Sequence, residues 1–429
     1  MFQKISNLVR VADIRKKIIF TLLMLIVFRI GTFIPVPFTN KEAIDFMTQE
    51  SVFGFMDIFG GGALQNFSIL AMGIMPYITA SIIMQLLQMD VVPTFTEWRS
   101  QGEVGRRKLA QVTRYATIGL AFIQAIAMSI GFNAMAGGQL ILNPGFKTFV
   151  VIAIVLTSGT AFLMWLGEQI TAHGVGNGIS IIIFAGIVAG IPNGVQQLFA
   201  TYFVNPGDEL FINIVIVALI ALVVVAVTVG VIYVIQAERK IPIQYAKRMV
   251  NRSPVGGHST HLPLKVNAAG VIPVIFAVAF IMAPRTIAGF FDNKFANSVE
   301  SIFDYTQPVG MIIYVVLIIA FTYFYTFVQV NPEQMAENLQ KQGGYVPGKR
   351  PGRVTEQYLT TVLYRLTFVG AIFLASVSVL PMVLGKLASL PESIQIGGTS
   401  LLIVVGVALQ TMKQLEGQLV KRHYQGFIR

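Results

Sequence analysis

The side chains that could bind a metal ion or form a catalytic site are few, and they lie in polar stretches of the sequence. The chain has four histidines, and only His258 and His261 stand close enough in sequence to share one metal ion. That pair lies in a loop rich in Gly, Ser and Pro, which is more typical of solvent-exposed histidines than of metal ligands. No zinc motif, phosphate-binding loop or nucleophile–base pair appears. The sequence therefore predicts no metal centre, no cofactor and no enzymatic activity.

Acidic side chains avoid the apolar segments, which bears on proton or cation transport. All 20 Asp and Glu residues fall in loops or at the ends of apolar runs. An ion-coupled transporter usually keeps ionisable groups inside the membrane, where they are costly and are retained for function. Coupled transport is therefore disfavoured. The one charge well inside an apolar run is Arg29, which we expect to snorkel or to pair with a loop carboxylate rather than to act in conduction.

The composition is that of a polytopic membrane protein. Of the 429 residues, 55% are hydrophobic and 12% are charged, whereas soluble domains carry about 25% charged residues. A helix needs roughly 20 apolar residues to cross the hydrocarbon core. Ten such spans are expected, of which the fifth is short and the first is interpreted as a retained span because it lacks a cleavage site. They lie at about 18–34, 69–88, 112–131, 148–167, 179–191, 211–235, 268–284, 309–330, 362–384 and 399–412.

The basic residues are distributed unevenly between the loops. Lys and Arg concentrate in the N-terminal tail, in 89–111, in 237–266, in 331–361 and in the C-terminal tail. The positive-inside rule then places both termini in the cytoplasm, which agrees with an even number of spans. The net charge of +11 is thus mainly topological, but the loops 237–266 and 331–361 hold more of it than orientation requires.

An internal repeat divides the chain into two halves. The segments GIMPYITASIIM (73–84) and GVIPVIFAVAFIM (270–282) share Gly-x-x-Pro-x-Ile at an offset of 197 residues, and neighbouring spans align at the same offset. Five spans per half is an odd number, so the second half must enter the membrane from the opposite side. The sequence therefore predicts an all-α membrane protein with two inverted five-helix halves, 1–205 and 206–429.

Isoleucines recur near the starts of three predicted spans. Ile74 and Ile78 share one face of the second span, Ile275 occupies the matching place in the repeat, and Ile179 and Ile183 begin the fifth span. Such a stripe is ordinarily core or lipid-facing. The alternative is a hydrophobic constriction that excludes water and ions by dewetting, yet can widen around a passing chain.

Long motifs resemble the SecY family of channel subunits of the Sec translocase. They include GIMPYITASIIMQLL, EVGRRKLAQVTRY, STHLPLKVNAAGVIP, NPEQMAENLQKQGGYVPGKRPG and GGTSLLIVVGV, and the similarity covers essentially the whole chain. The resemblance implies ten helices in two clamshell halves around an hourglass pore. It also implies a ring of aliphatic side chains at the waist, formed here by Ile74, Ile78, Ile179, Ile183, Ile275 and Ile403.

The resemblance assigns a plug and a lateral gate. The plug is a re-entrant element at about 54–66, with Asp57, Ile58, Phe59, Gly60, Gly61, Gly62, Ala63 and Leu64. The gate lies between the second and seventh spans and releases membrane helices into lipid. We expect Gln85 and Asn267 to meet across it.

The resemblance also implies partners and a function. The two basic loops would dock the SecA ATPase and the ribosome through Arg239, Lys240, Lys247, Arg248, Arg252, Lys349, Arg350 and Arg353, with Arg350 the foremost. SecE and SecG would be further subunits, and signal sequences and unfolded preproteins the cargo. The expected function is a protein-conducting channel in the cytoplasmic membrane. The alternative is a small-solute transporter built on an inverted repeat.

Overall fold

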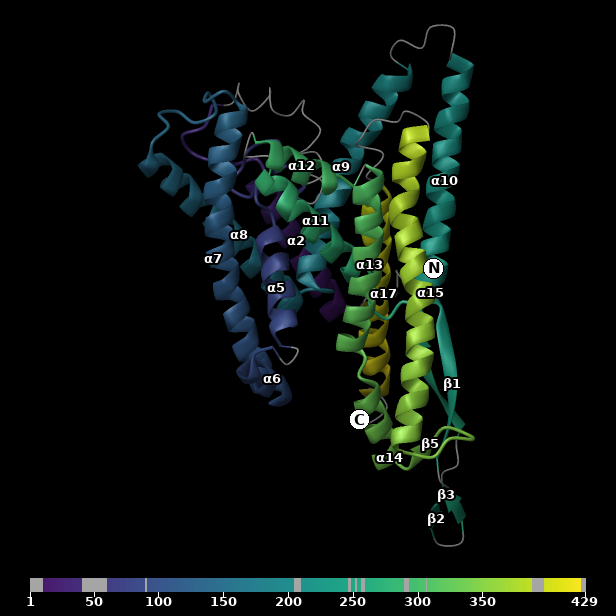
Figure 1. The fold of residues 1–429 in the computed structure, drawn as a ribbon. Coiled ribbons are helices and arrows are strands. Elements are labelled where there is room, and N and C mark those ends of the chain that lie inside the picture. Colours follow the sequence, from purple (N-terminus) through teal and green to yellow (C-terminus); the bar gives the residue numbers. More distant parts are fainter. Residues whose placement is uncertain are drawn as a thin grey trace.

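The structure is a computed structural model, an upright helical bundle with a small β-structure at its lower end (Figure 1). It describes residues 11–40, 60–88, 91–203, 210–245, 248–250, 253–255, 259–288, 293–305, 307–387 and 397–425. Within these ranges each predicted span corresponds to a helix. The helices of the first half are α2 (Ala12–Gly31), α5 (Met75–Leu87), α7 (Glu103–Met135), α8 (Phe146–His173) and α9 (Gly178–Phe203).

The second half contributes five more helices that correspond to predicted spans, and the short elements that connect them. The five are α10 (Leu210–Gln236), α11 (Ile272–Ala288), α13 (Pro308–Gln329), α15 (Arg353–Leu387) and α17 (Gly397–Gln425). Short helices are α6 (Pro93–Ser100), α12 (Lys294–Ile302) and α14 (Pro332–Lys341). Six helices among the described residues combine the length and hydropathy of a membrane span, and α5 and α11 are shorter apolar helices.

Two of the boundaries that differ from the sequence-based expectation involve a proline. The second span was expected from about residue 69, but α5 begins at Met75, and Pro76 lies in its first turn, where its missing N–H has no intrahelical partner to lose. The fifth span was expected to end at about 191, but α9 continues through Pro192 to Phe203. A proline inside an apolar helix is tolerated when neighbouring groups satisfy the freed carbonyl.

The internal repeat is visible in the backbone. Gly73 and Gly270 both have a left-handed φ, of 56° and 67°, and α5 and α11 each begin two residues later. The amide of Ile78 donates to the carbonyl of Ile74 over 3.1 Å, and 197 residues on, that of Ile275 donates to Val271 over 3.3 Å. The shared sequence motif therefore produces the same turn-to-helix junction in each half.

The fold is mostly helical, as predicted, and the loop 237–266 adds short strands that the sequence did not predict. The strands are β1 (Glu238–Tyr245), β2 (Arg248–Val250), β3 (Ser253–Val255), β4 (Ser259–Lys265) and β5 (Gly344–Tyr345). β1 is the central strand of an antiparallel sheet in the order β4–β1–β5, with Ile241 opposite Leu262. In β1 the residues Ile241 and Ile243 are buried, and they alternate with exposed neighbours, as expected of a half-buried strand.

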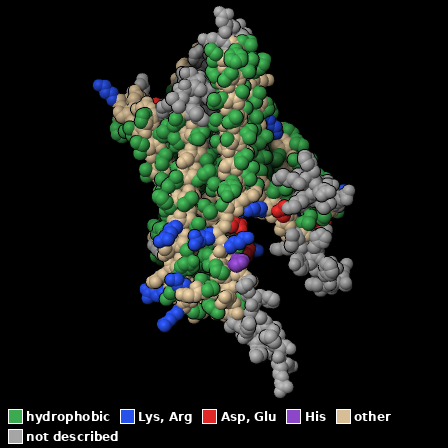
Figure 2. All heavy atoms as spheres, turned by 90° about the vertical axis from the view of Figure 1, so that its right-hand side faces the viewer, with side chains coloured by type: hydrophobic (Ala, Val, Ile, Leu, Met, Phe, Trp, Pro, Cys, Tyr) green, Lys and Arg blue, Asp and Glu red, His purple; other side chains and the backbone are tan. Residues whose placement is uncertain are grey.

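The surface divides into an apolar belt and a basic end. In Figure 2, hydrophobic side chains cover the upper helices, and Lys and Arg gather below them. The long helix α10 is exposed along most of its length and has one fully buried residue, Val231. Such a helix needs an apolar surrounding, because its exposed Leu and Val side chains would otherwise face water. The chain is therefore a multi-pass membrane protein.

Candidate functional site

The six predicted pore isoleucines all belong to, or pack against, one large hydrophobic cluster that draws residues from both halves. Five of them lie in one hydrophobic cluster with exposed fractions of 6% or less, and Ile179 is partly buried against that cluster. The five are Ile74, Ile78, Ile183, Ile275 and Ile403. They come from the start of α5, from α9, from the first turn of α11 and from α17. We call these six residues the isoleucine cluster.

The described part of the predicted plug packs into two hydrophobic clusters. We call Gly60–Leu64 the plug segment; Asp57, Ile58 and Phe59 lie outside the described residues. Ala63 is fully buried in the same hydrophobic cluster as the isoleucines. Leu64 belongs to a second cluster, formed with residues of α7 and α8. The segment therefore joins the isoleucine cluster to the packing of the first half.

Arg29 contacts the plug segment. Its Nη1 donates a hydrogen bond to the carbonyl oxygen of Gly61, and its guanidinium lies 4.8 Å from the centre of the Phe33 ring. The expectation that Arg29 snorkels or pairs with a loop carboxylate missed this partner. Sequence spacing gave no signal for it, because a backbone carbonyl 32 residues away carries no side-chain signature.

Further hydrogen bonds attach the chain after the plug segment to the end of α2. The side chain of Asn66 donates to the carbonyl of Thr32 over 3.2 Å. The amide of Ile69 donates to the carbonyl of Ile34 over 2.9 Å. These contacts hold the segment that leads into α5 against the end of α2, and this segment ends at Ile74.

The two predicted gate amides lie at the ends of neighbouring helices, but they do not bond to each other. Gln85, in α5, donates to Ser81 over 3.3 Å, and Asn267, before α11, donates to the carbonyl of Gly270 over 3.0 Å. α5 packs against α11. The carbonyl oxygen of each amide is buried without a hydrogen-bond partner, so each site retains an unsatisfied acceptor.

The predicted docking residues lie on a small subdomain at the basic end. Arg239 and Lys240 are exposed on β1, Lys349 and Arg350 are exposed in the turn before α15, and Arg353 is the exposed first residue of α15. Arg248 belongs to β2. Lys247 and Arg252 lie outside the described residues.

A separate hydrophobic core supports these charges. It joins Ile241 and Ile243 of the sheet to Leu339 of α14 and Leu359 of α15. Lys349 lies over the Tyr358 ring at 5.6 Å, and the hydroxyl of Thr355 donates to the carbonyl of Arg350 over 2.8 Å. The sheet thus gives the basic turn a fixed position, which the sequence analysis did not foresee.

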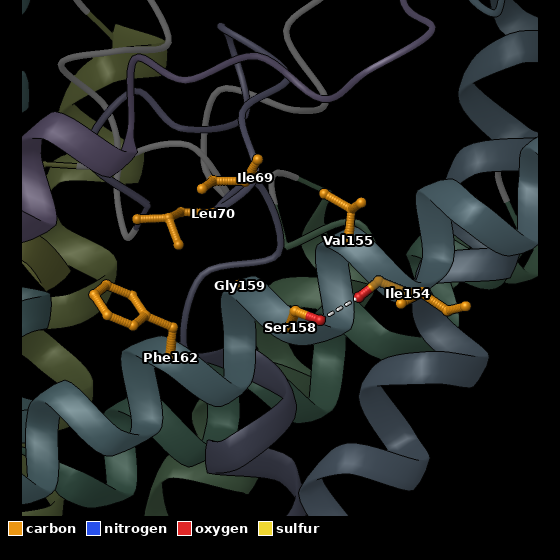
Figure 3. A pocket seen from close by; sticks show the side chains of 7 residues that line it. All are labelled: Ile69, Leu70, Ile154, Val155, Ser158, Gly159 and Phe162. Carbon is orange, nitrogen blue, oxygen red and sulfur yellow. Dashed lines mark hydrogen bonds between the residues drawn. The ribbon is translucent and has the colours of Figure 1, made fainter.

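An apolar pocket of about 260 Å³ lies beside the chain that leads into α5. Figure 3 shows Ile69 and Leu70 facing Val155 and Phe162 of α8 across it. Its one polar side chain is Ser158, whose hydroxyl donates to the carbonyl of Ile154 in its own helix. No ionisable group lines this pocket, so it offers neither the charge nor the donors that a polar solute would need.

Two of the ion pairs join neighbouring helices or their ends. Arg114 of α7 lies 2.7 Å from Glu168 of α8, and Arg285 of α11 lies 3.5 Å from Asp304 near the start of α13. Both join neighbouring helices of the same half. Among the described residues, no group of three or more His, Cys, Asp and Glu side chains is placed to hold a metal ion; His258 lies outside that part of the chain.

Comparisons with known proteins agree in one family. The SecY family model matches residues 68–412. The chain is similar to protein translocase subunit SecY of Bacillus licheniformis, with 69% identity over all of both chains. It is also similar to that of Bacillus subtilis, with 68% identity over all of both chains.

Solved structures share the fold. A protein-conducting channel superposes with a TM-score of 0.60 at 20% identity, covering 95% of this chain and 93% of the other. A SecY whose plug domain is described as stabilising the closed state and maintaining a membrane seal gives 0.61 at 21% identity, covering 95% and 92%. Sec61 of a canine ribosome–channel complex gives 0.59 at 19% identity, covering 95% and 93%.

These relatives set aside the alternative of a small-solute transporter. The family model, the curated relatives and the shared fold all point to passage of polypeptides through the membrane. The chain therefore belongs to the SecY family and is the protein-conducting channel subunit of a preprotein translocase.

Proposed function

We propose that the isoleucine cluster is the seal of the channel and the ring through which an unfolded preprotein passes. The observation that carries the proposal is that isoleucines distant in sequence, from both halves, belong to one buried hydrophobic cluster. Apolar contacts are non-directional, so branched aliphatic side chains can exclude water when closed and reshape around any passing side chain. Transport of this kind needs no covalent chemistry, and we propose that the chain itself is not an enzyme.

The plug segment completes the seal in this proposal. Its support is the burial of Ala63 among the isoleucines' neighbours and the plug of the structural relative that maintains a membrane seal. Residues 54–66 would leave the pore when a preprotein enters. Glycines at 60–62 suit a movable element, because they allow many backbone conformations and bring no side-chain contacts.

We propose that the seam between α5 and α11 is the lateral gate. Its support is that α5 and α11 pack against each other while each also packs against a helix of its own half, α7 and α13. Gln85 and Asn267 would bias this gate. Each has a buried carbonyl oxygen without a partner, and such an acceptor favours any rearrangement that supplies a donor.

The basic subdomain is the proposed docking surface for the SecA motor and for the ribosome. Exposed Arg and Lys on a rigid support suit both rRNA phosphate and the acidic or carbonyl groups of a protein partner. The ribosome-bound Sec61 relative supports the ribosome as a partner in this proposal. SecE and SecG as further subunits, cytoplasmic termini and the cytoplasmic membrane complete the proposal on family grounds.

Site-specific cross-linking to a stalled preprotein tests the pore. The chain has no cysteine, so Ile78→Cys and Ile275→Cys each introduce a single thiol that can react with a cysteine in the stalled chain. Both should cross-link in the presence of the motor and ATP. The matched control is Phe280→Cys, on the same helix as Ile275 but 51% exposed. Cross-linking at Phe280 that equals that at both isoleucines would contradict the pore assignment.

A further inference from the structure

Arg29 is a basic side chain of a membrane-spanning helix that bonds to the plug segment. We propose that Arg29 is a latch that holds the plug segment in the idle channel; the inference rests on the proposed role of that segment as a plug. No comparison with a known protein assigns this arginine a role.

The geometry of the latch involves two helices and one turn. Nη1 of Arg29 donates to the carbonyl oxygen of Gly61. The ring of Phe33, one helical turn farther along the chain, lies 4.8 Å from the guanidinium. An aromatic face at this distance attracts the cation and orients its planar donors. Phe33 therefore holds the guanidinium toward the plug segment.

The acceptor is seated closely against both helices. Gly61 has a φ of +68°, and a Cβ atom added there would lie 3.0 Å from the Cα of Gly186 in α9 and 3.6 Å from the Phe28 ring of α2. A larger residue would push the turn away from α9 and carry its carbonyl away from Arg29. The sequence thus places a glycine where the plug must approach the helices most closely.

The strength of this contact suits a reversible latch. A charged donor on a neutral carbonyl forms a stronger hydrogen bond than two neutral groups do. Among the described residues no carboxylate forms an ion pair with Arg29. The hydrogen bond to the Gly61 carbonyl can be exchanged for one to water or to a carbonyl of the passing chain. Arg29 therefore biases the plug toward the closed position without locking it.

The latch lies within one half of the molecule. Arg29 and Phe28 belong to α2, Gly186 to α9, and the plug segment to the chain between α2 and α5. None of these contacts crosses the seam between α5 and α11. Opening the lateral gate alone should therefore leave the plug in place, and its release should require a chain inside the pore.

Thiol labelling measures the latch directly. Ala63 is fully buried, and Ala63→Cys supplies the only thiol of the chain. In the assembled complex in proteoliposomes without preprotein, Arg29→Met should raise the maleimide labelling rate of this thiol on the order of tenfold, because a charge-assisted hydrogen bond is lost. Arg29→Lys retains the charge with a shorter reach and should label at an intermediate rate.

The control and the separating experiment use other parts of the first half. Arg114→Met also removes an arginine of a spanning helix, but Arg114 bonds to Glu168 and not to the plug segment, so labelling should stay at the parent rate. Equal rates for parent, Arg29→Met and Arg114→Met would overturn the latch. Deletion of 57–65 separates the two proposals. If the deletion leaks ions while Arg29→Met labels like the parent, the plug stands and the latch is wrong; if the deletion is as tight as the parent, both fail.

Discussion

The isoleucine cluster and the basic subdomain differ in the kind of contact on which each depends. The cluster is apolar, buried and built from helices of both halves, so it depends on non-directional contacts that can re-form around different side chains. The subdomain exposes charges on a small sheet with its own core, so it holds directional groups in fixed places. A seal needs interchangeable contacts, whereas a docking surface needs a rigid support.

Charge reversal on the subdomain should give the largest effect. Arg350→Glu should reduce motor-driven translocation roughly ten- to a hundredfold, because like charges placed at an interface cost several kcal/mol. Ion conductance of the idle channel should stay at the parent value, since the cluster is untouched. The assay is ATP-dependent import of a preprotein into proteoliposomes at two salt concentrations.

A matched control lies in the same loop. Lys341 is exposed and already bonds to Glu337 over 2.7 Å, so Lys341→Glu should affect translocation far less than Arg350→Glu. If the two charge reversals reduce translocation equally, the reduction comes from surface charge in general, and the assignment of Arg350 as a docking residue is wrong.

A polar substitution in the cluster should give an effect of intermediate size and of the opposite kind. Ile275→Ser puts a hydroxyl where apolar burial excludes water, and a buried hydroxyl without a partner costs about 1–3 kcal/mol, which favours wetting. Idle ion conductance should rise on the order of tenfold while motor binding is unchanged. Phe280→Ser, on an exposed face of α11, should leave the idle channel impermeable to ions, and a leak as large as that of Ile275→Ser would contradict the proposed seal.

The smallest effect is expected at the gate amides. Gln85→Leu removes a buried oxygen that has no partner in this state and that would gain one if the proposed gate rearranged, and such a contact between membrane helices is worth about 1 kcal/mol. The gate equilibrium should therefore shift about fivefold, measured as altered translocation of preproteins with weak signal sequences. Leu86, the exposed neighbour, provides the control Leu86→Ala. If the parent and Gln85→Leu translocate preproteins with weak signal sequences at the same rate, Gln85 does not influence the gate.

Long periodic features could be predicted from the sequence, and short irregular ones could not. Hydropathy located the ten spans, and the shared Gly-x-x-Pro located the matched junctions before α5 and α11. The sheet of β1, β4 and β5 was missed because β5 comes from a loop about 80 residues beyond β4, and a two-residue strand has no pattern of its own. The continuation of α9 through Pro192 was missed because proline normally ends a helix in water.

The candidate site also has residues that the sequence could predict and contacts that it could not. Five of the isoleucines could be named as candidates from their spacing and Ile403 from the resemblance, and their role as a pore ring stays a prediction. The contact of Arg29 with Gly61 could not be named, since its acceptor is a backbone carbonyl. The absence of a direct bond between Gln85 and Asn267 was also unforeseen, because each amide finds a nearer partner in its own segment.

The sequence by itself determined that this protein crosses the membrane many times, that its basic loops share one side and that it belongs to a family of protein channels. Those properties follow from local composition and from motifs, each of which acts along the chain. The tertiary structure alone decided which groups meet: Ala63 with the isoleucine cluster, Arg29 with Gly61, and β5 with β1. Such contacts depend on the packing of segments far apart in sequence, and no local pattern encodes their partners.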